Sequence, residues 1–527
     1  MKSVTILTIA AMAMAAATGC SHDNPTPSPE PPVKGGEFNE FGFTTTAPVT
    51  LCVDYGDMAG MPANVYFEVY DTCPVEETET AYAKIAGVEP LNAGYTDGQG
   101  RFEGTIELPA YIRKAYVLTP AFYARTLLEA TRSGDMLTAS AESGAPANAA
   151  PASTRAKEYH STAVERDGWK TWLGSYDTTY GSIGYEYDGD LKVKNYGALL
   201  KAHASVFDTT KKCPKEYRSS RDLYLEKSAE VVITLLGSNT CWNSSMGYYY
   251  YKTGNKPKSL ADANVVMIFP NTQDGQWSND PKTARKYKGV DRGTAVQLIY
   301  YPEIADGSKA GATTVFPADY RIGFVLATNA WTNRLRAGDK KYRAATSDGL
   351  SVNNNGVAYQ TPRTAVFRYT DKKSGINSVL FSFEDHTNDE NFSDVVFTMT
   401  SNPVDAVTDI PSVDVNDGKK TANVLRGIYA FEDLWPSRGD YDMNDVMVRS
   451  DYEKVFNEKG VFEESFMLKT FANFAGNANG LAVTLTGAAA DAKLEFSVRK
   501  PGAETFEAAD FERDGKVVLL TPDVKET

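Results

Sequence analysis

The same acidic pattern occurs twice in this chain of 527 residues. Residues 383–385 read Phe-Glu-Asp, and after a short spacer residues 389–395 read Asp-Glu-Asn-Phe-Ser-Asp-Val. Residues 431–433 again read Phe-Glu-Asp, and after a spacer three residues longer, residues 440–446 read Asp-Tyr-Asp-Met-Asn-Asp-Val. Composition alone rarely produces such agreement twice at close range. The pattern therefore predicts one structural element used twice, with its acids beside strands that start at Val395 and Val446.

The crowding of like charge limits what these segments can form. Residues 381–450 hold 14 acidic and 5 basic side chains, a net charge of −9, against −14 for the whole chain. Two carboxylates about 4 Å apart repel by roughly 4 kcal/mol at an effective dielectric constant near 20. Several of them can converge only around a cation or around shared protons. Most of the negative charge of the chain is therefore predicted to serve a local purpose.

The residue types favour Ca²⁺ as that cation. Oxygen-bearing side chains at alternate positions resemble the start of a calcium loop, in which positions 1, 3 and 5 converge on one ion. Neither copy is an EF-hand, because Asp394 and Asp445 stand where that loop needs Gly. A Glu-Asp pair from each Phe-Glu-Asp segment can supply the missing oxygens. The predicted ligands of two Ca²⁺ ions are Glu384, Asp385, Asp389, Asn391, Asp394, Glu432, Asp433, Asp440, Asp442, Asn444 and Asp445.

Two other interpretations of the acidic motifs stay open. Paired carboxylates also serve as general acid and base in glycoside hydrolysis, which makes Glu384 or Glu432 with a partner Asp a candidate pair. The second alternative is that the acids are solvated turn residues between strands. His386 in the first copy corresponds to Leu434 in the second, so a shared role for this histidine is not expected.

Overall composition excludes some functions. The 68 acidic residues outnumber the 54 basic ones, so the chain lacks the basic surface by which proteins bind nucleic acid. Only four histidines are present, which argues against a zinc site built on three of them. The run Met246-Gly247-Tyr248-Tyr249-Tyr250-Tyr251 is either an aromatic platform for carbohydrate or an ordinary strand with alternating faces.

Short β-runs separated by turn signals predict a mainly β fold. The expected arrangement is a small immunoglobulin-like or transthyretin-like sandwich, followed by two larger β-sandwich or jelly-roll-like regions. A turn at 96–100 feeds the alternating strand at 101–108, and the one candidate for a long helix is 121–137. The predicted segments are a small sandwich at 37–120, a linker at 121–157, a β-rich domain with the first motif at 158–403, a connector at 404–420 and a β-rich region with the second motif at 421–527.

The N-terminus predicts export and lipidation. Lys2 precedes an apolar run from Val4 to Ala17, which is too short to span a bilayer. The following Thr18-Gly19-Cys20 resembles the lipobox of bacterial lipoproteins, so 1–19 is predicted as a signal peptide, Cys20 as the lipidated residue and 20–36 as a proline-rich tether. The alternative is an ordinary secretory signal cleaved near Ala17. The polar residues 21–24 resemble the surface-export signals of Bacteroidetes lipoproteins.

The remaining four cysteines are an even number in an oxidising compartment. Cys52 could pair with Cys73, and Cys213 with Cys241, although four buried thiols are an equally good interpretation.

Taken together, the lipobox, the N-terminal sandwich and the two motifs resemble LruC domain-containing lipoproteins of Bacteroidetes. The first motif resembles a repeated bacterial surface domain of unknown function with recurring Glu and Asp residues, and residues 476–481 resemble a later turn and strand of the LruC domain. This resemblance implies a β-protein held at the cell surface of the outer membrane by its lipid. Members of that family continue further, so an incomplete last sheet or a truncated form is expected.

Three functions follow as hypotheses. The first is an adhesion or glycan/protein-binding module with two calcium-stabilised loops, which needs an extracellular glycan or protein ligand and no nucleic acid. The second is a surface polysaccharide hydrolase, against which the duplication counts because an active site rarely needs two copies. The third is a structural subunit of a surface assembly.

Overall fold

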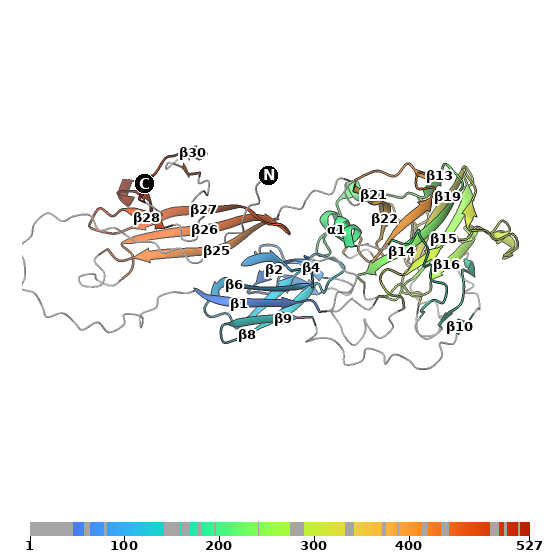
Figure 1. Cartoon of the computed structure of the whole chain (residues 1–527), viewed down its shortest axis with the longest axis horizontal. Helices are drawn as coiled ribbons and strands as arrows, with labels where there is room; N and C mark the ends of the chain where they lie inside the picture. The colour runs from blue at the N-terminus through green and yellow to red at the C-terminus, as the bar shows by residue number, and fades with distance from the viewer. Residues whose placement is uncertain are drawn as a thin grey trace, which may run out of the picture.

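The chain folds into three β-rich regions (Figure 1). The computed structural model describes residues 46–56, 64–77, 82–141, 159–160, 169–177, 181–193, 197–240, 242–274, 289–331, 342–371, 376–386, 389–413, 420–433, 442–484, 495–499, 503–514 and 517–526. The N-terminal sheet lies between the large central sandwich and the C-terminal sheets in this view. The mainly β, sandwich-type fold class predicted from the sequence is confirmed.

The N-terminal region is one strongly curved sheet of seven strands. Its order is β5 (Asn92–Tyr95), β2 (Tyr66–Tyr70), β7 (Lys114–Leu118), β8 (Leu127–Ser133), β9 (Met136–Ser140), β1 (Thr46–Asp54) and β6 (Arg101–Pro109). Alternate residues of β1 (Val49, Leu51 and Val53) are buried, as expected for a strand with one face on the core. The predicted turn before β6 is present, because the Asp97 carboxylate accepts hydrogen bonds from the backbone N–H groups of Gln99 and Arg101.

The linker predicted at 121–157 is wrong in its first part. Residues 127–140 form the hairpin of β8 and β9, and β9 pairs in parallel with β1 near the far edge of the sheet. The helix candidate at 121–137 is wrong for the same reason. Apolar residues here alternate with period two (Leu128, Ala130), and pairing with existing strands buries that face better than an isolated helix would.

The central region is a sandwich of two sheets. One sheet has the order β11 (Trp169–Trp172), β16 (Val265–Phe269), β15 (Ser245–Lys252), β19 (Tyr320–Ala327), β13 (Leu223–Leu225) and β24 (Val407–Thr408), with β20 (Arg343–Ala345) on β19. The other has the order β17 (Ala295–Gln297), β14 (Ala229–Ser238), β23 (Val395–Asn402), β22 (Ile376–Phe383) and β21 (Thr364–Asp371), with β18 (Val315–Phe316) on β14. Phe324 of the first sheet packs against Phe381 and Phe397 of the second, with ring centroids 5.1 and 5.0 Å away.

The second sheet of the sandwich is covered on both faces. Phe381 and Phe383 of β22 face the sandwich core, whereas Leu380 lies in a different apolar cluster with helix α1 (Gly197–Val206). On that outer side the imidazole of His203 lies 3.0 Å from the Ser382 hydroxyl. Because both faces are buried, β22 and β23 read as nearly continuous buried runs. The first acidic motif joins these two strands.

The tyrosine run at 246–251 is strand β15. Tyr248 and Tyr249 are fully buried, and their hydroxyls donate to the Ile299 carbonyl and the Ser347 hydroxyl, respectively. Tyr250 likewise donates to the Tyr301 carbonyl. The strand is therefore confirmed, but residues 245–249 are all buried and do not alternate between core and surface. The hydroxyls of Tyr248, Tyr249 and Tyr250 are engaged within the protein instead of being presented to a carbohydrate.

The C-terminal region consists of small sheets. The long strands β25 (Lys420–Phe431), β26 (Val446–Asn457) and β27 (Gly460–Asn473) form one sheet, and β28 (Leu481–Thr484), β32 (Val517–Thr521) and β31 (Glu512–Asp514) form another. A shorter pair of this region is β29 (Ser497–Val498) with β30 (Glu507–Ala508).

Two further short pairs lie earlier in the chain: β3 (Val75–Glu77) with β4 (Tyr82–Lys84), and β10 (Tyr159–His160) with β12 (Tyr176–Asp177). Single 3₁₀ turns lie at η3 (Lys215–Tyr217), η4 (Leu260–Asp262), η5 (Ile304–Asp306) and η6 (Val524–Glu526).

The connector predicted at 404–420 is partly wrong. Within this segment, β24 pairs with β13 of the sandwich. After β24, Ser412 forms a parallel β-bridge with Arg368 of β21. These residues belong to the sandwich because their backbone groups find partners on its edge strands, a contact that side-chain periodicity does not reveal. The C-terminal region begins at β25, and its tip packs on the N-terminal sheet, where Phe456 lies 5.7 Å from Tyr95 between ring centroids.

Candidate metal centres

Each acidic motif is the turn of an antiparallel β-hairpin. The first joins β22 to β23, with Phe383 paired to Val395, and the second joins β25 to β26, with Phe431 paired to Val446. The Glu-Asp pair therefore follows the end of one strand, and the last Asp of the motif precedes the start of the next. Carboxylate oxygens of Glu384, Asp385 and Asp394 lie within 4.8 Å of one another, and so do those of Glu432, Asp433 and Asp445.

In the first hairpin, backbone N–H groups hold the acids in position. The Asp394 carboxylate accepts a hydrogen bond of 2.6 Å from the Asp385 N–H, and the Glu384 carboxylate accepts one of 3.1 Å from the Phe392 N–H. Phe392 has a φ of 59°, a left-handed conformation that aims its N–H back at Glu384. The Ser393 N–H donates to Asn391 Oδ1 at 2.7 Å and closes a local turn.

The second hairpin repeats this framework residue by residue. The Asp445 carboxylate accepts a hydrogen bond of 2.8 Å from the Asp433 N–H, and the Glu432 carboxylate accepts one of 3.2 Å from the Met443 N–H. Met443 has a φ of 56°. The Asn444 N–H donates to Asp442 Oδ1 at 3.3 Å. The sequence repeat is thus a structural repeat, in which both loops present their acids with the same backbone geometry.

The acids of the first hairpin are buried. Glu384, Asp385 and Asp394 have exposed fractions of 1%, 3% and 3%. Burial raises the pKa of Asp385 to about 7 and, together with the neighbouring acids, raises the pKa values of Glu384 and Asp394 well above their usual range. The cause in each case is that removal from water disfavours the charged form, and the nearby like charges add to that effect.

Distant segments supply partners to the first hairpin. The buried Arg363 guanidinium lies 3.3 Å from Glu384 and offsets part of its charge. The Thr240 hydroxyl, from the chain after β14, donates to Asp385 Oδ2 at 2.7 Å, and the Thr328 hydroxyl, after β19, donates to the Asp385 carbonyl at 2.9 Å. Sequence reasoning missed these three residues, since no local signal connects them to the motif.

Two predicted ligands of the first site lie beside its centre. The pKa of Asp389 is raised, chiefly by burial. Its Oδ2 accepts a hydrogen bond of 2.6 Å from the Asn391 amide, which also donates to the Thr209 carbonyl at 3.1 Å. Asn391 is thus engaged on its amide nitrogen, and on its oxygen by the Ser393 N–H, within the hairpin itself. His386 packs between Trp242 and Tyr342, with ring centroids 5.0 and 4.9 Å away.

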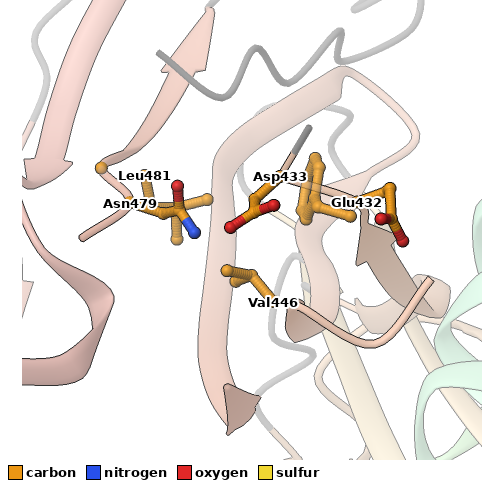
Figure 2. A pocket seen from close by; sticks show the side chains of 7 residues that line it. Glu432, Asp433, Val446, Asn479 and Leu481 are labelled. Atoms are coloured by element: carbon orange, nitrogen blue, oxygen red, sulfur yellow. The ribbon is translucent and has the colours of Figure 1, made fainter. Parts of the chain in front are cut away.

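The second hairpin is more open. Glu432, Asp433 and Asp445 are partly exposed and Asp442 is exposed, whereas the predicted ligand Asp440 lies outside the described residues. The structure gives these carboxylates no ion pair with a described Lys or Arg. Figure 2 shows a pocket between the second hairpin and the start of β28. It is lined by Phe431, Glu432, Asp433, Val446, Asn479, Gly480 and Leu481.

The predicted disulfides and the predicted N-terminal signal were also compared with the structure. Cys52, Cys73 and Cys213 are free thiols, so the Cys52–Cys73 disulfide is not formed in this structure, and the Cys73 thiol instead donates to the Val75 carbonyl. Cys241, the proposed partner of Cys213, lies outside the described residues. The signal peptide, Cys20 and the tether also lie outside them. Within the described part of the chain, no helix has the length and apolar character required to cross a bilayer.

Comparisons with known proteins identify two segments of the chain. Residues 47–141 match a family described as "Domain of unknown function (DUF8469)", and residues 316–402 match one described as "Domain of unknown function (DUF4114)". The first match covers the N-terminal sheet, including β8 and β9, and the second includes the first acidic hairpin but not the second. No curated protein matches the chain, and no solved structure does.

Proposed function

We propose that each acidic hairpin binds one Ca²⁺ ion, and that the protein is a surface-anchored lipoprotein acting as an adhesion or glycan/protein-binding module. The observation that carries the proposal is the repeated framework. Two loops of different spacer length hold three carboxylates within 4.8 Å of one another through equivalent backbone hydrogen bonds. Solvated turn residues have no physical reason to keep such a geometry twice.

Electrostatics supports a bound cation at both hairpins. Carboxylates 4.8 Å apart repel by about 3.5 kcal/mol per pair at an effective dielectric constant near 20. An ion that binds three of them converts this repulsion into attraction. Oxygen ligands without sulfur or imidazole suit a hard ion, and Ca²⁺ tolerates the irregular, flexible geometry of a hairpin turn.

The surface location remains part of the proposal. The lipobox-like residues before Cys20 and the proline-rich tether would place the β regions outside the cell, on the outer membrane. Extracellular calcium modules work at ion concentrations of about 0.1–1 mM, so loops held by Ca²⁺ would be ordered there. The ligand would be an extracellular glycan or protein, and the acidic charge of the chain disfavours nucleic acid.

One observation favours the hydrolase alternative. A carboxyl with a pKa near 7, as in Asp385, is suited to general acid or base work near neutral pH. Against it, Glu384 and Asp385 are 1% and 3% exposed, so a sugar has no access to them among the described residues. Turnover of a polysaccharide that is lost in Glu384→Gln would establish this alternative. Association with partner proteins that does not depend on Ca²⁺ would instead favour a structural subunit.

The decisive experiment is metal analysis and melting of the full chain. We expect about two Ca²⁺ ions per chain by elemental analysis. Removal of Ca²⁺ by EDTA should lower the melting temperature by about 5–10 °C, because an ion present at 100 times its Kd adds about 2.7 kcal/mol of stability. The double variant Asp394→Asn, Asp445→Asn should lose both ions and the response to EDTA.

Matched control variants separate ion binding from a general loss of charge. Asp306→Asn in the sandwich and Glu504→Gln in the C-terminal region remove exposed acids that lie outside both hairpins. Each should keep the full ion content and the full EDTA response. An EDTA-treated wild-type chain with an unchanged melting curve would refute the calcium proposal.

A further inference from the structure

The turn between β27 and β28, residues 474–480, lies against the second hairpin. The backbone N–H groups of Phe474 and Ala475 donate to the Asp445 carbonyl at 3.0 and 3.2 Å. The Asn477 amide donates to Asp433 Oδ2 at 2.9 Å. A segment more than forty residues away in sequence from Asp433 therefore contacts the Asp433 carboxylate and the Asp445 backbone directly.

Asn479 of the same turn is a buried residue whose side-chain nitrogen has no hydrogen-bond partner in the described part of the chain. Its exposed fraction is 7%, and its Nδ2 makes no hydrogen bond with any described residue. The residue lines the same pocket as Glu432 and Asp433. Figure 2 shows the Asn479 amide and the Asp433 carboxylate directed toward one another across that pocket. Buried polar side chains are nearly always hydrogen-bonded, so the unpaired Nδ2 indicates that a group that would satisfy this amide is absent.

We propose that Asn477 and Asn479 are Ca²⁺ ligands, and that the ion of the second hairpin clips the sheet β28–β32–β31 onto the sheet β25–β26–β27. This inference rests on the proposed function, because it names further ligands for one of the two ions. The amide oxygen of Asn is a common Ca²⁺ ligand, and rotation of the amide by half a turn exchanges its nitrogen and oxygen. Three carboxylates and two amides provide at least five oxygens.

The small contact between the two C-terminal sheets explains why such a clip matters. Among the described residues, the buried apolar cluster at this contact consists of Val446, Val448, Leu481 and Val524, with Phe431, Leu468 and Leu520 packed against it. Large apolar side chains of this region remain exposed, among them Phe474 at 72% and Phe506 at 52%. Because apolar burial contributes little here, a shared ion would be a main link between the turn and the hairpin.

The test uses the full chain, Ca²⁺ alone as the probe, and calorimetric titration after removal of metal. Asn479→Ala and Asn477→Ala should each weaken one of the two bound ions at least about tenfold, since removing a direct ligand affects affinity no less than removing an outer-shell partner does. Asn479→Asp keeps an oxygen in place and should retain binding. Asn355→Ala, which removes an exposed amide from a distant turn, should behave as the wild type.

Hydrogen exchange supplies a second readout of the clip. In the wild type, Ca²⁺ should protect the backbone amides of β28 and β32, and Asn479→Ala should lose that protection while the protection of β22 and β23 stays. Unchanged Ca²⁺ affinity in both alanine variants would overturn this inference and leave the proposed function standing. A wild-type chain that binds no Ca²⁺ would overturn both. If Asn479→Ala does not fold, the Ca²⁺ affinity of Asn477→Ala, which changes an exposed residue, tests the inference instead.

Discussion

The two acidic hairpins share a backbone but differ in their surroundings. The first is buried inside a sandwich, where Arg363 pairs with Glu384 and Thr240 donates to Asp385. The second is half-exposed. There Asp433 is the equivalent of Asp385, and the Asn477 amide donates to it. A loop sequence of this kind therefore specifies how the acids are presented, whereas the elements packed around it decide how their charge is compensated.

The largest expected effect comes from removing the positive charge of the Arg363 side chain at the first site. Arg363→Gln leaves Glu384 without its buried partner, and breaking a buried pair costs about 3–5 kcal/mol. Urea denaturation of the metal-free chain should show that loss. In Ca²⁺ the loss should shrink, because the ion takes over the charge and binds more tightly once the nearby positive charge is gone. An equal loss with and without Ca²⁺ would contradict this account.

Removing the last acid of each motif should affect the two sites unequally. Asp394→Asn changes a buried acceptor of a 2.6 Å hydrogen bond as well as a ligand, so we expect about 2–3 kcal/mol of destabilisation in Ca²⁺. Asp445→Asn acts at a half-exposed site, where we expect about 1–2 kcal/mol. Melting of the two single variants beside Asp306→Asn gives the comparison. A larger effect at Asp445 would reverse our ranking of the sites.

The pH dependence of the metal-free chain should come from the first site. Burial raises the pKa of Asp385 from an ordinary value of 3.8 to about 7. The folded state then holds a proton that the unfolded state releases, so this stabilising contribution is complete below about pH 4 and is lost as the pH rises through about 7. In EDTA the melting temperature should therefore decline relative to that in Ca²⁺ between about pH 4 and pH 7.

Calcium should remove that decline, because the ion binds the deprotonated carboxylates. Buried His203, whose pKa is lowered to about 3, acts in the opposite direction, since acid protonates it more readily in the unfolded state. Its contribution is the same with or without metal, so the difference between the EDTA and Ca²⁺ curves isolates the carboxylates. Parallel curves would show that these acids do not bind the ion.

The smallest effect is expected at Met443, the left-handed residue of the second turn, and its counterpart in the first turn gives the contrast. Met443 is partly exposed with a φ of 56°, so Met443→Gly should be neutral or stabilise the chain by up to about 1 kcal/mol. The equivalent Phe392 is fully buried among apolar side chains, so Phe392→Gly should destabilise the chain by several kcal/mol, at least about 3. Met443→Ala serves as the control for loss of the side chain. A destabilising Met443→Gly would mean that this side chain packs in the site.

Local patterns predicted much of the fold. Period-two alternation at 101–108 located β6, and the acidic repeat located two hairpin turns, because a turn and its flanking strands lie within about twenty residues of one another. The same reasoning failed at 121–137, where a weak helical pattern lies in the strands β8 and β9. That segment is decided by pairing with β1, which comes some eighty residues earlier in the chain.

The sequence by itself determined which carboxylates converge at each candidate site. Glu384, Asp385 and Asp394 meet because a hairpin brings the two ends of its turn together, and the second motif repeats that arrangement. Only the tertiary structure decided which distant residues contact those carboxylates. Arg363, Thr240 and Asn477 contact the carboxylates from segments that no sequence spacing relates to the motif. Short-range chain geometry is encoded locally, whereas burial and charge compensation depend on which distant surfaces pack together.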